Sequence, residues 1–482
     1  MKIRFSEGKT SRSRFLGAVP LLLTLAAGLL FGCAEEPKIS KIEIPDRLEL
    51  ARLLKEGQFA RLDQLMNQIQ DAYESKNIDE TALRSVVLAF HGADPEFAER
   101  LSEWRAAVPK SFAPYVASGS YQLALAWVTR GTEFGKFTSS KQFEVMRRHL
   151  LDARASYRAG IERRAEIPIA LADLITVSMG YGGGRRAVDR VYLEAKAVLP
   201  ASSMVHRRYH YALSEKWYGS KLEQRQLRDQ LLQRFPNNPS FKWAKYVEDE
   251  DQQWDKAYKL ANEKRTLEAI AIADSLLQRS DSRWNRLYRG DILHILGKYD
   301  EALEEYFRAL RISPGWSEPV KQIQYVMTRQ RRRLDSLKTW QQLIRYDPYN
   351  PEFLLPYASF LETLAKDEEA RALVDRALVY GADDDKVRTA LGRRYLVEKK
   401  MERAIAEMRR AVELVPARAD NWLYLARALQ MNEDCSAIEP YKVVVSICKA
   451  LDEDKSKPWR RCKLVQAHEA ELSIKNITEA CE

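Results

Sequence analysis

Apolar residues recur at intervals of three and four positions along most of the chain, which is the spacing of helices with one buried face. The pattern is clear in residues 50–75, 142–164 and 187–199. Gly and Pro are scarce, at 20 and 18 of 482 residues, and the abundant Ala, Leu, Arg, Glu and Gln favour helix. We therefore predict an all-α protein that is too long for a single core.

A longer period appears in the C-terminal half of the chain. Pro314, Pro348 and Pro416 lie in one 34-residue register, with Ala382 at the vacant step, and each follows a helix-like run. Helix pairs approach closely where small side chains face each other and large ones fill the space beside them. The register collects such positions, small on the first helix and then small and large on the second: Gly290, Ala358, Gly392 and Ala426; Ala302, Ser336, Ala370 and Ala404; Tyr306, Trp340, Val374 and Met408.

Two segments carry a family resemblance. Residues 422–429, WLYLARAL, and residues 297–302, GKYDEA, resemble the tetratricopeptide repeat (TPR) family. The resemblance implies helical hairpins that stack into an α-solenoid with a concave groove lined by the first helix of each hairpin. Residues 205–239 and 250–280 resemble degenerate units. Gln324 stands where the family has a small residue.

The same resemblance predicts which residues face the groove. One equivalent inward position holds Asp291, Tyr325, Ser359, Arg393 and Arg427. A second holds Leu287, Lys321, Leu355, Thr389 and Leu423. The Lys/Asn pattern with which some family members clamp a terminal carboxylate is missing. Two alternatives stay open for the two arginines: they hold an acidic peptide segment, or they pair with neighbouring acids.

The amino terminus predicts export. Residues 1–14 are basic and polar, and residues 15–31 form an apolar run, which together indicate a secretory signal. The next residues, Leu30-Phe31-Gly32-Cys33, resemble the bacterial lipobox. That resemblance implies cleavage before Cys33, diacylglycerol on its thiol and acylation of the new amino group. The alternative is an uncleaved transmembrane helix, for which the apolar run is short.

The lipobox resemblance also bears on the compartment. Ala34 stands where an Asp would retain a lipoprotein in the inner membrane, so we expect a lipid anchor in the outer membrane that faces the periplasm. Residues 34–42 read as a polar tether. The chain carries a formal charge of +10, of which the segment 1–32 contributes +4. The rest permits contact with anionic lipid or acidic partners but does not indicate nucleic acid.

Residues 50–180 resemble a second family, an uncharacterised bacterial helical domain without known activity. The resemblance therefore brings no function. We expect buried aromatic residues with an arginine stacked on them. The residues that carry the resemblance are Leu53, Leu54, Gly57, Phe59, Leu62, Asp63, Trp104, Pro109, Ser111, Tyr121, Ala126, Trp127, Arg130 and Gly131.

All the cysteines other than Cys33 lie near the C-terminal end, at Cys435, Cys448, Cys462 and Cys481, which indicates two disulfides in an exported chain. Residues 436–451 read as one helix, so Cys435 and Cys448 would lie about 20 Å apart along its axis, too far for a disulfide. A hairpin that turns near residue 454 predicts the pairs Cys448–Cys462 and Cys435–Cys481. The alternative, a zinc site, does not fit the spacings.

Few residues suggest catalysis. His206 and His210 share a helix face but lack the Glu of a metalloprotease motif, so we expect a solvated basic face. Glu74-Ser75 matches the catalytic acid of some lytic transglycosylases, without their glycan-binding motifs. The run Gly182–Gly184 reads as a loop, and the basic cluster 329–333 as a solvated turn that could also contact acidic lipid or polysaccharide.

These observations predict the following organisation: signal peptide 1–32, tether 33–45, helical N-terminal domain 46–200, TPR-like superhelix 201–431 and Cys-rich helical cap 432–482. We expect no enzyme, no cofactor and no metal. The leading hypothesis is an envelope lipoprotein that acts as a protein-interaction scaffold in secretion, pilus, polysaccharide-export or outer-membrane assembly. The alternatives are a periplasmic binder of a carbohydrate polymer and, less favoured, a peptidoglycan lytic enzyme.

Overall fold

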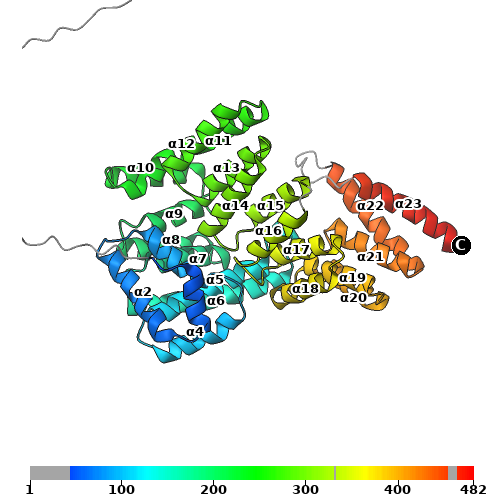
Figure 1. The fold of residues 1–482 in the computed structure, drawn as a ribbon, viewed down its shortest axis with the longest axis horizontal. Coiled ribbons are helices and arrows are strands. Elements are labelled where there is room, and N and C mark those ends of the chain that lie inside the picture. Colours follow the sequence, from blue (N-terminus) through cyan, green and yellow to red (C-terminus); the bar gives the residue numbers. More distant parts are fainter. Residues whose placement is uncertain (1–43, 331–332, 454–463, 482) are drawn as a thin grey trace, which may run out of the picture. The chain divides into compact units, whose positions relative to one another are not determined.

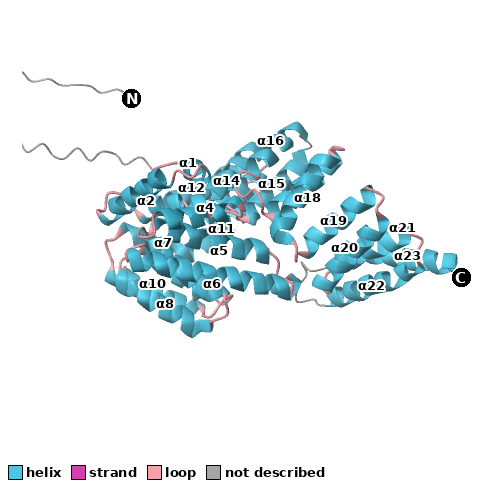
Figure 2. Ribbon diagram, turned by 90° about the horizontal axis from the view of Figure 1, so that it is seen from below, coloured by secondary structure: helices cyan, strands magenta, loops and turns pink. Residues whose placement is uncertain are grey.

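The structure is a computed structural model that describes residues 44–330, 333–453 and 464–481. These residues form helices and the loops that join them (Figure 2). Neither a strand nor a bridge occurs in these residues. The prediction of an all-α fold is therefore confirmed. The described residues belong to one compact unit, 42–482.

The N-terminal region contains ten helices of very unequal length, coloured blue to green in Figure 1. They are α1 (Arg47–Lys55), α2 (Phe59–Glu74), α3 (Glu80–Val87), α4 (Glu96–Ala107), α5 (Ala113–Arg130), α6 (Ser140–Arg163), α7 (Pro168–Gly180), α8 (Gly184–Val198), α9 (Ser203–Ala212) and α10 (Lys221–Arg234). Short 3₁₀ turns lie at η1 (Leu88–Phe90), η2 (Gly135–Phe137) and η3 (Pro239–Phe241). One hydrophobic core runs from Leu50 to Ala244, so α9 and α10 belong to it.

Helix α5 lies at the centre of this core. Thirteen of its 18 residues are buried, on all of its faces, because α6, α4, α2 and α7 surround it. An apolar sequence without a polar stripe is typical of such a helix. Helix α9 packs mainly against α7 and only weakly against α10, so residues 205–239 do not form a repeat-like hairpin.

The repeat region consists of helical hairpins. It contains α11 (Lys242–Asn262), α12 (Thr266–Arg279), α13 (Arg283–Ile295), α14 (Tyr299–Ile312), α15 (Ser317–Gln330), α16 (Arg333–Leu343), α17 (Pro351–Thr363), α18 (Asp367–Gly381), α19 (Asp385–Val397), α20 (Met401–Leu414) and α21 (Ala419–Met431). From α13 on, the first helices begin at the spacing of the predicted register, and so do the second helices. The TPR-like solenoid is thereby confirmed, and the unit with Gln324 keeps the register because that side chain is exposed.

Small and large residues interlock within the hairpins as the register predicts. A Cβ atom on Gly290 would lie 2.4 Å from the ring of Tyr306, and one on Gly392 would lie 2.9 Å from Cγ of Met408. The hairpin turns repeat as well, because the second residue after α13, α17 and α19 adopts a left-handed conformation, at Gly297, Ala365 and Lys399 respectively.

The C-terminal cap is a further pair of helices. A 3₁₀ turn, η4 (Cys435–Ala437), leads into α22 (Ile438–Glu453), which packs against α23 (Leu464–Cys481). Cys435 and Cys481 form a disulfide with 6.2 Å between their Cα atoms. Cys448 is buried and disulfide-bonded. Its predicted partner, Cys462, lies outside the described residues.

The amino-terminal predictions also lie outside the described residues. They comprise the signal peptide, Cys33 and the tether up to residue 43. None of the helices between residues 44 and 481 that the structure describes has the length and apolarity needed to span a bilayer.

The N-terminal region contacts the loops that join one repeat to the next. The Asp347 carboxylate accepts a hydrogen bond from the Ala93 backbone at 2.8 Å. The Gln142 side chain donates to Asp384 at 3.2 Å, and Lys386 pairs with Glu133 at 2.6 Å. These repeat residues come just before, or at the start of, first helices. The N-terminal ends of α17 and α19 thus rest on the N-terminal region.

Candidate functional site

Three first helices of the repeat region, α11, α13 and α15, line a pocket of about 470 Å³. Such a volume falls within the range of about 300–1,000 Å³ that is common for ligand sites. The residues around it are mostly aromatic, with one carboxylate. They are Tyr258, Asp291, His294, Ile295, Tyr299, Gln322 and Tyr325. We call this site the groove pocket.

Asp291 is the charged group of the groove pocket. Its two carboxylate oxygens accept hydrogen bonds from the hydroxyls of Tyr258 and Tyr306, each at 2.9 Å. Burial raises the pKa of Asp291 despite these two donors. Nearby Glu318 raises the pKa further by repulsion between like charges.

Aromatic rings form the walls of the pocket. The His294 ring lies 5.0 Å from the ring of Tyr325, edge to face, and 5.6 Å from the ring of Tyr299. The Tyr325 side chain is 46% exposed, and Ile295 is also exposed. Exposed aromatic and aliphatic groups beside a carboxylate give the pocket an apolar surface with one fixed polar anchor.

The five predicted groove residues lie in different environments. Asp291 and Tyr325 line the groove pocket together. Ser359 on α17 is half-buried. Arg393 pairs with Glu362 on the neighbouring first helix at 2.6 Å, and Arg427 forms two bonds of 2.6 Å with Glu469 of the cap. Both arginines are therefore in ion pairs with acids of the chain.

The second inward position was predicted wrongly for most repeats. Leu287, Thr389 and Leu423 are buried between helices rather than exposed in the groove. Lys321 is exposed and pairs with Glu318 at 3.0 Å. The 34-residue register identifies equivalent positions, but packing against the next helix decides which of them reaches solvent.

The sequence analysis missed Tyr258 and His294. Tyr258 lies on α11, where the unit is one position shorter than those that follow. Its hairpin turn is at Lys264 and the next is at Gly297, one position closer than the register requires, and both residues adopt a left-handed conformation. When the repeat spacing is shortened by one position at this unit, Tyr258 occupies the position equivalent to Asp291. The shorter spacing was the signal that could have identified it.

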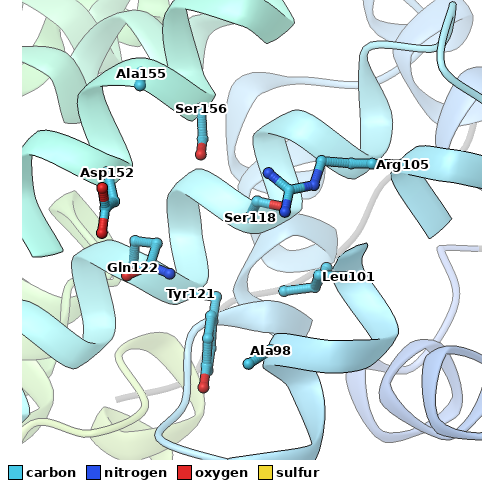
Figure 3. Close-up of a pocket in the computed structure, with 9 residues that line it drawn as sticks. All are labelled: Ala98, Leu101, Arg105, Ser118, Tyr121, Gln122, Asp152, Ala155 and Ser156. Atoms are coloured by element: carbon cyan, nitrogen blue, oxygen red, sulfur yellow. The ribbon is translucent and has the colours of Figure 1, made fainter. Parts of the chain in front are cut away.

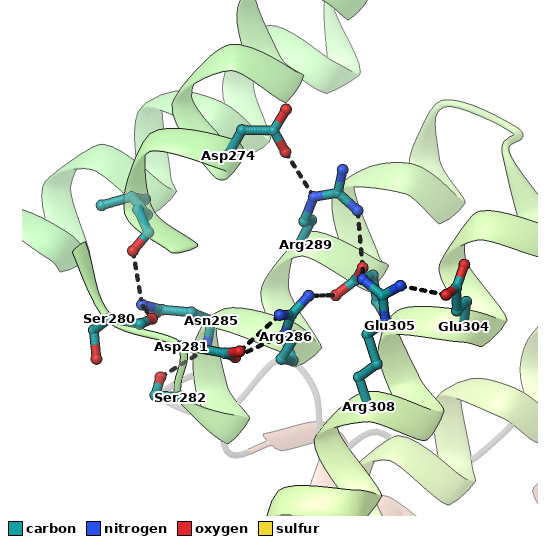
Figure 4. Close-up of polar contacts among 11 residues, drawn as sticks. Asp274, Ser280, Asp281, Ser282, Asn285, Arg286, Arg289, Glu304, Glu305 and Arg308 are labelled. Carbon is teal, nitrogen blue, oxygen red and sulfur yellow. Dashed lines mark hydrogen bonds and ion pairs between the residues drawn. The ribbon is translucent and has the colours of Figure 1, made fainter. Parts of the chain in front are cut away.

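An ion-pair network lies on α12, α13 and α14 (Figure 4). Glu305 is 2% exposed and pairs with Arg286 at 2.9 Å, Arg289 at 3.0 Å and Arg308 at 3.0 Å. Further acids bind the outer sides of the same arginines, such as Asp274 on Arg289 at 2.8 Å. Every charge in it has an opposite partner, so we assign this network to holding the hairpins together.

A second pocket of about 320 Å³ lies in the N-terminal region among α4, α5 and α6 (Figure 3). Arg105 and Asp152 lie on opposite sides of it. The hydroxyl of Tyr121 is 3.0 Å from the hydroxyl of Tyr380 on α18, which ties one wall to the repeats. The remaining lining residues are Ala98, Leu101, Ser118, Gln122, Ala155 and Ser156.

Glu74, the candidate catalytic acid, is held as a carboxylate. Arg164 donates to it at 2.7 and 2.6 Å, and Gln70 donates at 2.9 Å. The bonds from Arg164 lower the pKa of Glu74. A general acid needs a raised pKa, so the environment of Glu74 is opposite to the one that this role requires.

The prediction of a solvated basic face at His206 was wrong. His206 is 0% exposed, and its ring nitrogens lie 2.9 Å from the Tyr192 hydroxyl and 3.0 Å from the Pro200 carbonyl oxygen. Burial lowers the pKa of His210 to about 4, and Arg228 adds to the effect. No cluster of His, Cys, Asp and Glu suited to a metal occurs in the described part of the chain.

Two smaller predictions have definite outcomes. Gly182 and Gly183 lie in the turn between α7 and α8, as predicted, and Gly184 begins α8. The Arg130 guanidinium lies 5.9 Å from the centre of the Phe143 ring, whereas buried Trp104 packs against Phe90. The predicted arginine stacking thus occurs on another ring. The side chains of the basic cluster 329–333 lie outside the described residues.

A family model matches part of the N-terminal region. Residues 46–182 match a family model described as a domain of unknown function, DUF4034. No curated protein matches the sequence. The structure of the APC/C hetero-tetramer Cut9–Hcn1 is similar over 90% of both chains at 12% identity and a TM-score of 0.40.

Other similar structures are shorter TPR proteins. YrrB, described as a TPR protein with an unusual peptide-binding site, is 15% identical, with 41% of this chain and 97% of YrrB covered and a TM-score of 0.29. A thermophilic TPR protein of Thermus thermophilus is 19% identical, with 38% of this chain and 99% of that protein covered and a TM-score of 0.28.

Proposed function

We propose that this protein is a lipid-anchored scaffold of the bacterial cell envelope that binds a protein partner through the groove pocket. The observation that carries the proposal is the pocket itself, where aromatic side chains from three first helices, including the exposed Tyr325, surround one carboxylate. Aromatic residues on an accessible surface are the usual anchors of protein–protein contacts. The stacked hairpins supply a rigid frame for them.

The absence of an assembled catalytic site in the described residues fits a binding role. Glu74 is locked in bonds to Arg164, and the buried ring of His206 has partners on both nitrogens. We therefore propose a scaffold rather than an enzyme.

The envelope location rests on the amino-terminal sequence. A basic segment, an apolar run and Cys33 after Leu-Phe-Gly support export and acylation. Several acyl chains hold a protein stably on a membrane. The anchor would keep the repeats near the outer membrane, where secretion, pilus, polysaccharide-export or assembly machinery is available as a partner.

Photocrosslinking in living cells tests the partner. Tyr325→p-benzoylphenylalanine places a reactive group at the pocket, and Tyr211→p-benzoylphenylalanine is the matched control, because Tyr211 is 45% exposed and Tyr325 is 46% exposed. We expect a protein adduct at position 325 that is missing at position 211. Identical adducts at both positions, or none at position 325, would refute binding at the groove.

Fractionation tests the anchor. Cys33→Ser removes the thiol that would carry diacylglycerol, so we expect the protein to leave the outer-membrane fraction while its circular dichroism spectrum stays unchanged. The mature wild-type protein should be heavier than its polypeptide by the mass of its acyl chains. A wild-type chain that begins upstream of Cys33 and carries no lipid contradicts this part of the proposal.

A carbohydrate polymer is the second candidate ligand, because the Tyr258, Tyr299 and Tyr325 rings could also stack on sugars. The same crosslinking distinguishes the two, since a protein adduct gives a discrete band that protease removes. An adduct that resists protease and disappears with a glycosidase would favour the polymer.

A further inference from the structure

The groove pocket contains a negative charge that the described side chains do not balance. Asp291 is half-buried, and its hydrogen-bond donors, Tyr258 and Tyr306, are neutral. No described lysine or arginine lies within ion-pair distance of it, and the neighbouring charge that acts on it is that of Glu318, which pairs with Lys321 at 3.0 Å. A half-buried charge of this kind is costly until a cation compensates it.

Acids on two later first helices, α17 and α19, show the contrast with Asp291. Glu362 on α17 pairs with Arg393 at 2.6 Å, Glu352 on α17 pairs with Lys386 at 3.1 Å, and Asp385 on α19 pairs with Arg418 at 2.5 Å. The chain thus supplies a cation to these three acids of later repeats, whereas the donors to Asp291 are neutral. Asp291 also lines a pocket, so its carboxylate is within reach of a partner.

The walls of the pocket suit a cation as well. Tyr258, His294, Tyr299 and Tyr325 surround Asp291 with aromatic rings, and the negative faces of such rings attract ammonium and guanidinium groups. Ile295 adds an exposed apolar surface along which the methylene chain of a long cationic side chain could pack.

We infer that the groove pocket binds a lysine or arginine side chain of the protein partner. The charged end of that side chain forms an ion pair with the Asp291 carboxylate, and its stem packs against the aromatic walls. This inference rests on the proposed function and specifies the partner as a segment with an exposed basic residue. An acidic polysaccharide is disfavoured, because Asp291 and Glu318 would repel it.

Selection of displayed random twelve-residue peptides against the full chain in detergent tests this inference. We expect the selected peptides to share one lysine or arginine, and replacement of that residue by methionine to lower affinity about tenfold. For the Asp291→Asn protein, the same methionine replacement in the peptide should lower affinity by less than about twofold, because the ion pair is already lost. The matched control, Asp229→Asn, removes an exposed carboxylate on α10. It should keep the full tenfold difference in affinity between the two peptides.

A second variant guards against misfolding. Asp291→Asn alters the bonds to Tyr258 and Tyr306, so its thermal unfolding is compared with that of the wild type. Glu318→Gln leaves those bonds intact and removes the neighbouring negative charge together with its exposed ion pair to Lys321. It should weaken the basic peptides about twofold. Unchanged affinity in both variants would overturn the inference.

The remaining outcomes separate the inference from the proposed function. Peptides that lack a basic residue, but lose binding in Tyr325→Ala, would overturn the inference and leave the groove as a protein-binding site. Failure to select any peptide that depends on Tyr325 would overturn both. Neutral oligosaccharides that bind the wild type and fail on Tyr325→Ala would identify a carbohydrate site instead.

Discussion

The α5–α6 hairpin of the N-terminal region and the α13–α14 hairpin of the repeats contain the same contact, a glycine on one helix against a tyrosine ring on the next. A Cβ atom on Gly119 would lie 2.6 Å from the Tyr157 ring, and one on Gly290 would lie 2.4 Å from the Tyr306 ring. Both tyrosine hydroxyls donate to an aspartate, at 3.0 Å and 2.9 Å respectively. The small-to-large packing rule is thus common to both regions.

The two hairpins differ in where the aspartate comes from. Asp291 follows Gly290 directly, so one hairpin holds the whole contact. Asp173 lies on α7, so its contact with Tyr157 needs a third helix. The repeat contact is local in the sequence, whereas the contact in the N-terminal region exists only after three helices have packed. The comparison leads to four predictions.

Valine at the two glycines should give the largest effects. Gly119→Val should lower the free energy of unfolding by about 3 kcal/mol, because α5 is buried on all faces and cannot move away from Tyr157. Gly290→Val should cost about 2 kcal/mol, because one side of α13 is open and the helix can shift. Urea unfolding followed by circular dichroism measures both.

Gly135→Ala is the control for this pair, since a Cβ there meets Phe143 at an ordinary 3.8 Å. It should change stability by less than about 0.5 kcal/mol. Equal costs at Gly119 and Gly290 would show that burial of α5 does not make its glycine more critical.

Asp347, where the two regions meet, should give a pH-dependent effect of about 2 kcal/mol. It is buried, and burial raises its pKa to about 6 from 3.8. The folded state therefore favours the protonated form of Asp347. The contribution of this proton to the free energy of unfolding is present below about pH 4 and is lost as the pH rises through about 6. Asp347→Asn should therefore gain stability relative to the wild type as the pH rises from 4 to 7.

The difference between the two proteins is the quantity to measure, because His91 acts in the opposite direction. Burial lowers the pKa of His91 to about 4, so its contribution is lost as the pH falls. That contribution is common to both proteins and cancels. A stability difference that stays constant between pH 4 and pH 7 would contradict the raised pKa of Asp347.

Removal of the two tyrosine hydroxyls compares the aspartate contacts directly. Tyr157→Phe should cost about 1.5 kcal/mol, because buried Asp173 keeps only the longer bond from Arg208 at 3.2 Å. Tyr306→Phe should cost about 1 kcal/mol, since Asp291 keeps the bond from Tyr258 and is closer to solvent. Urea midpoints at one pH give both values. A larger cost at Tyr306 would reverse the order that the structure predicts.

The smallest effect concerns an ion pair between the regions. Lys386 and Glu133 are each a little under one-third exposed and lie 2.6 Å apart. Glu133→Gln keeps the pair of Lys386 with Glu352 and should cost roughly 1 kcal/mol. The exposed pair of Lys298 with Glu301 should contribute less than about 0.5 kcal/mol, measured in Glu301→Gln. Thermal unfolding at low salt compares them. Equal losses of stability in the two variants would mean that the ion pair between the regions contributes no more than an exposed ion pair.

Two of the seven residues that line the groove pocket, Asp291 and Tyr325, could be predicted from the sequence. Asp291 and Tyr325 occupy equivalent positions on consecutive 34-residue units, and the register places them on one face of the first helices. Tyr258 and His294 could not be found in that way. Tyr258 lies on a unit with a shorter spacing, and His294 reaches the pocket through the shape of the packed helices.

By itself, the sequence determined the helices, the 34-residue period and the interlocking of small and large residues, because all three depend on neighbours within one hairpin. Only the tertiary structure decided the burial of His206, the packing of α9 on α7 and the pairing of Arg393 and Arg427 with acids. It also decided that Asp291 has no cation beside it in the described part of the chain. These features depend on residues far apart in the sequence, whose approach no local pattern records.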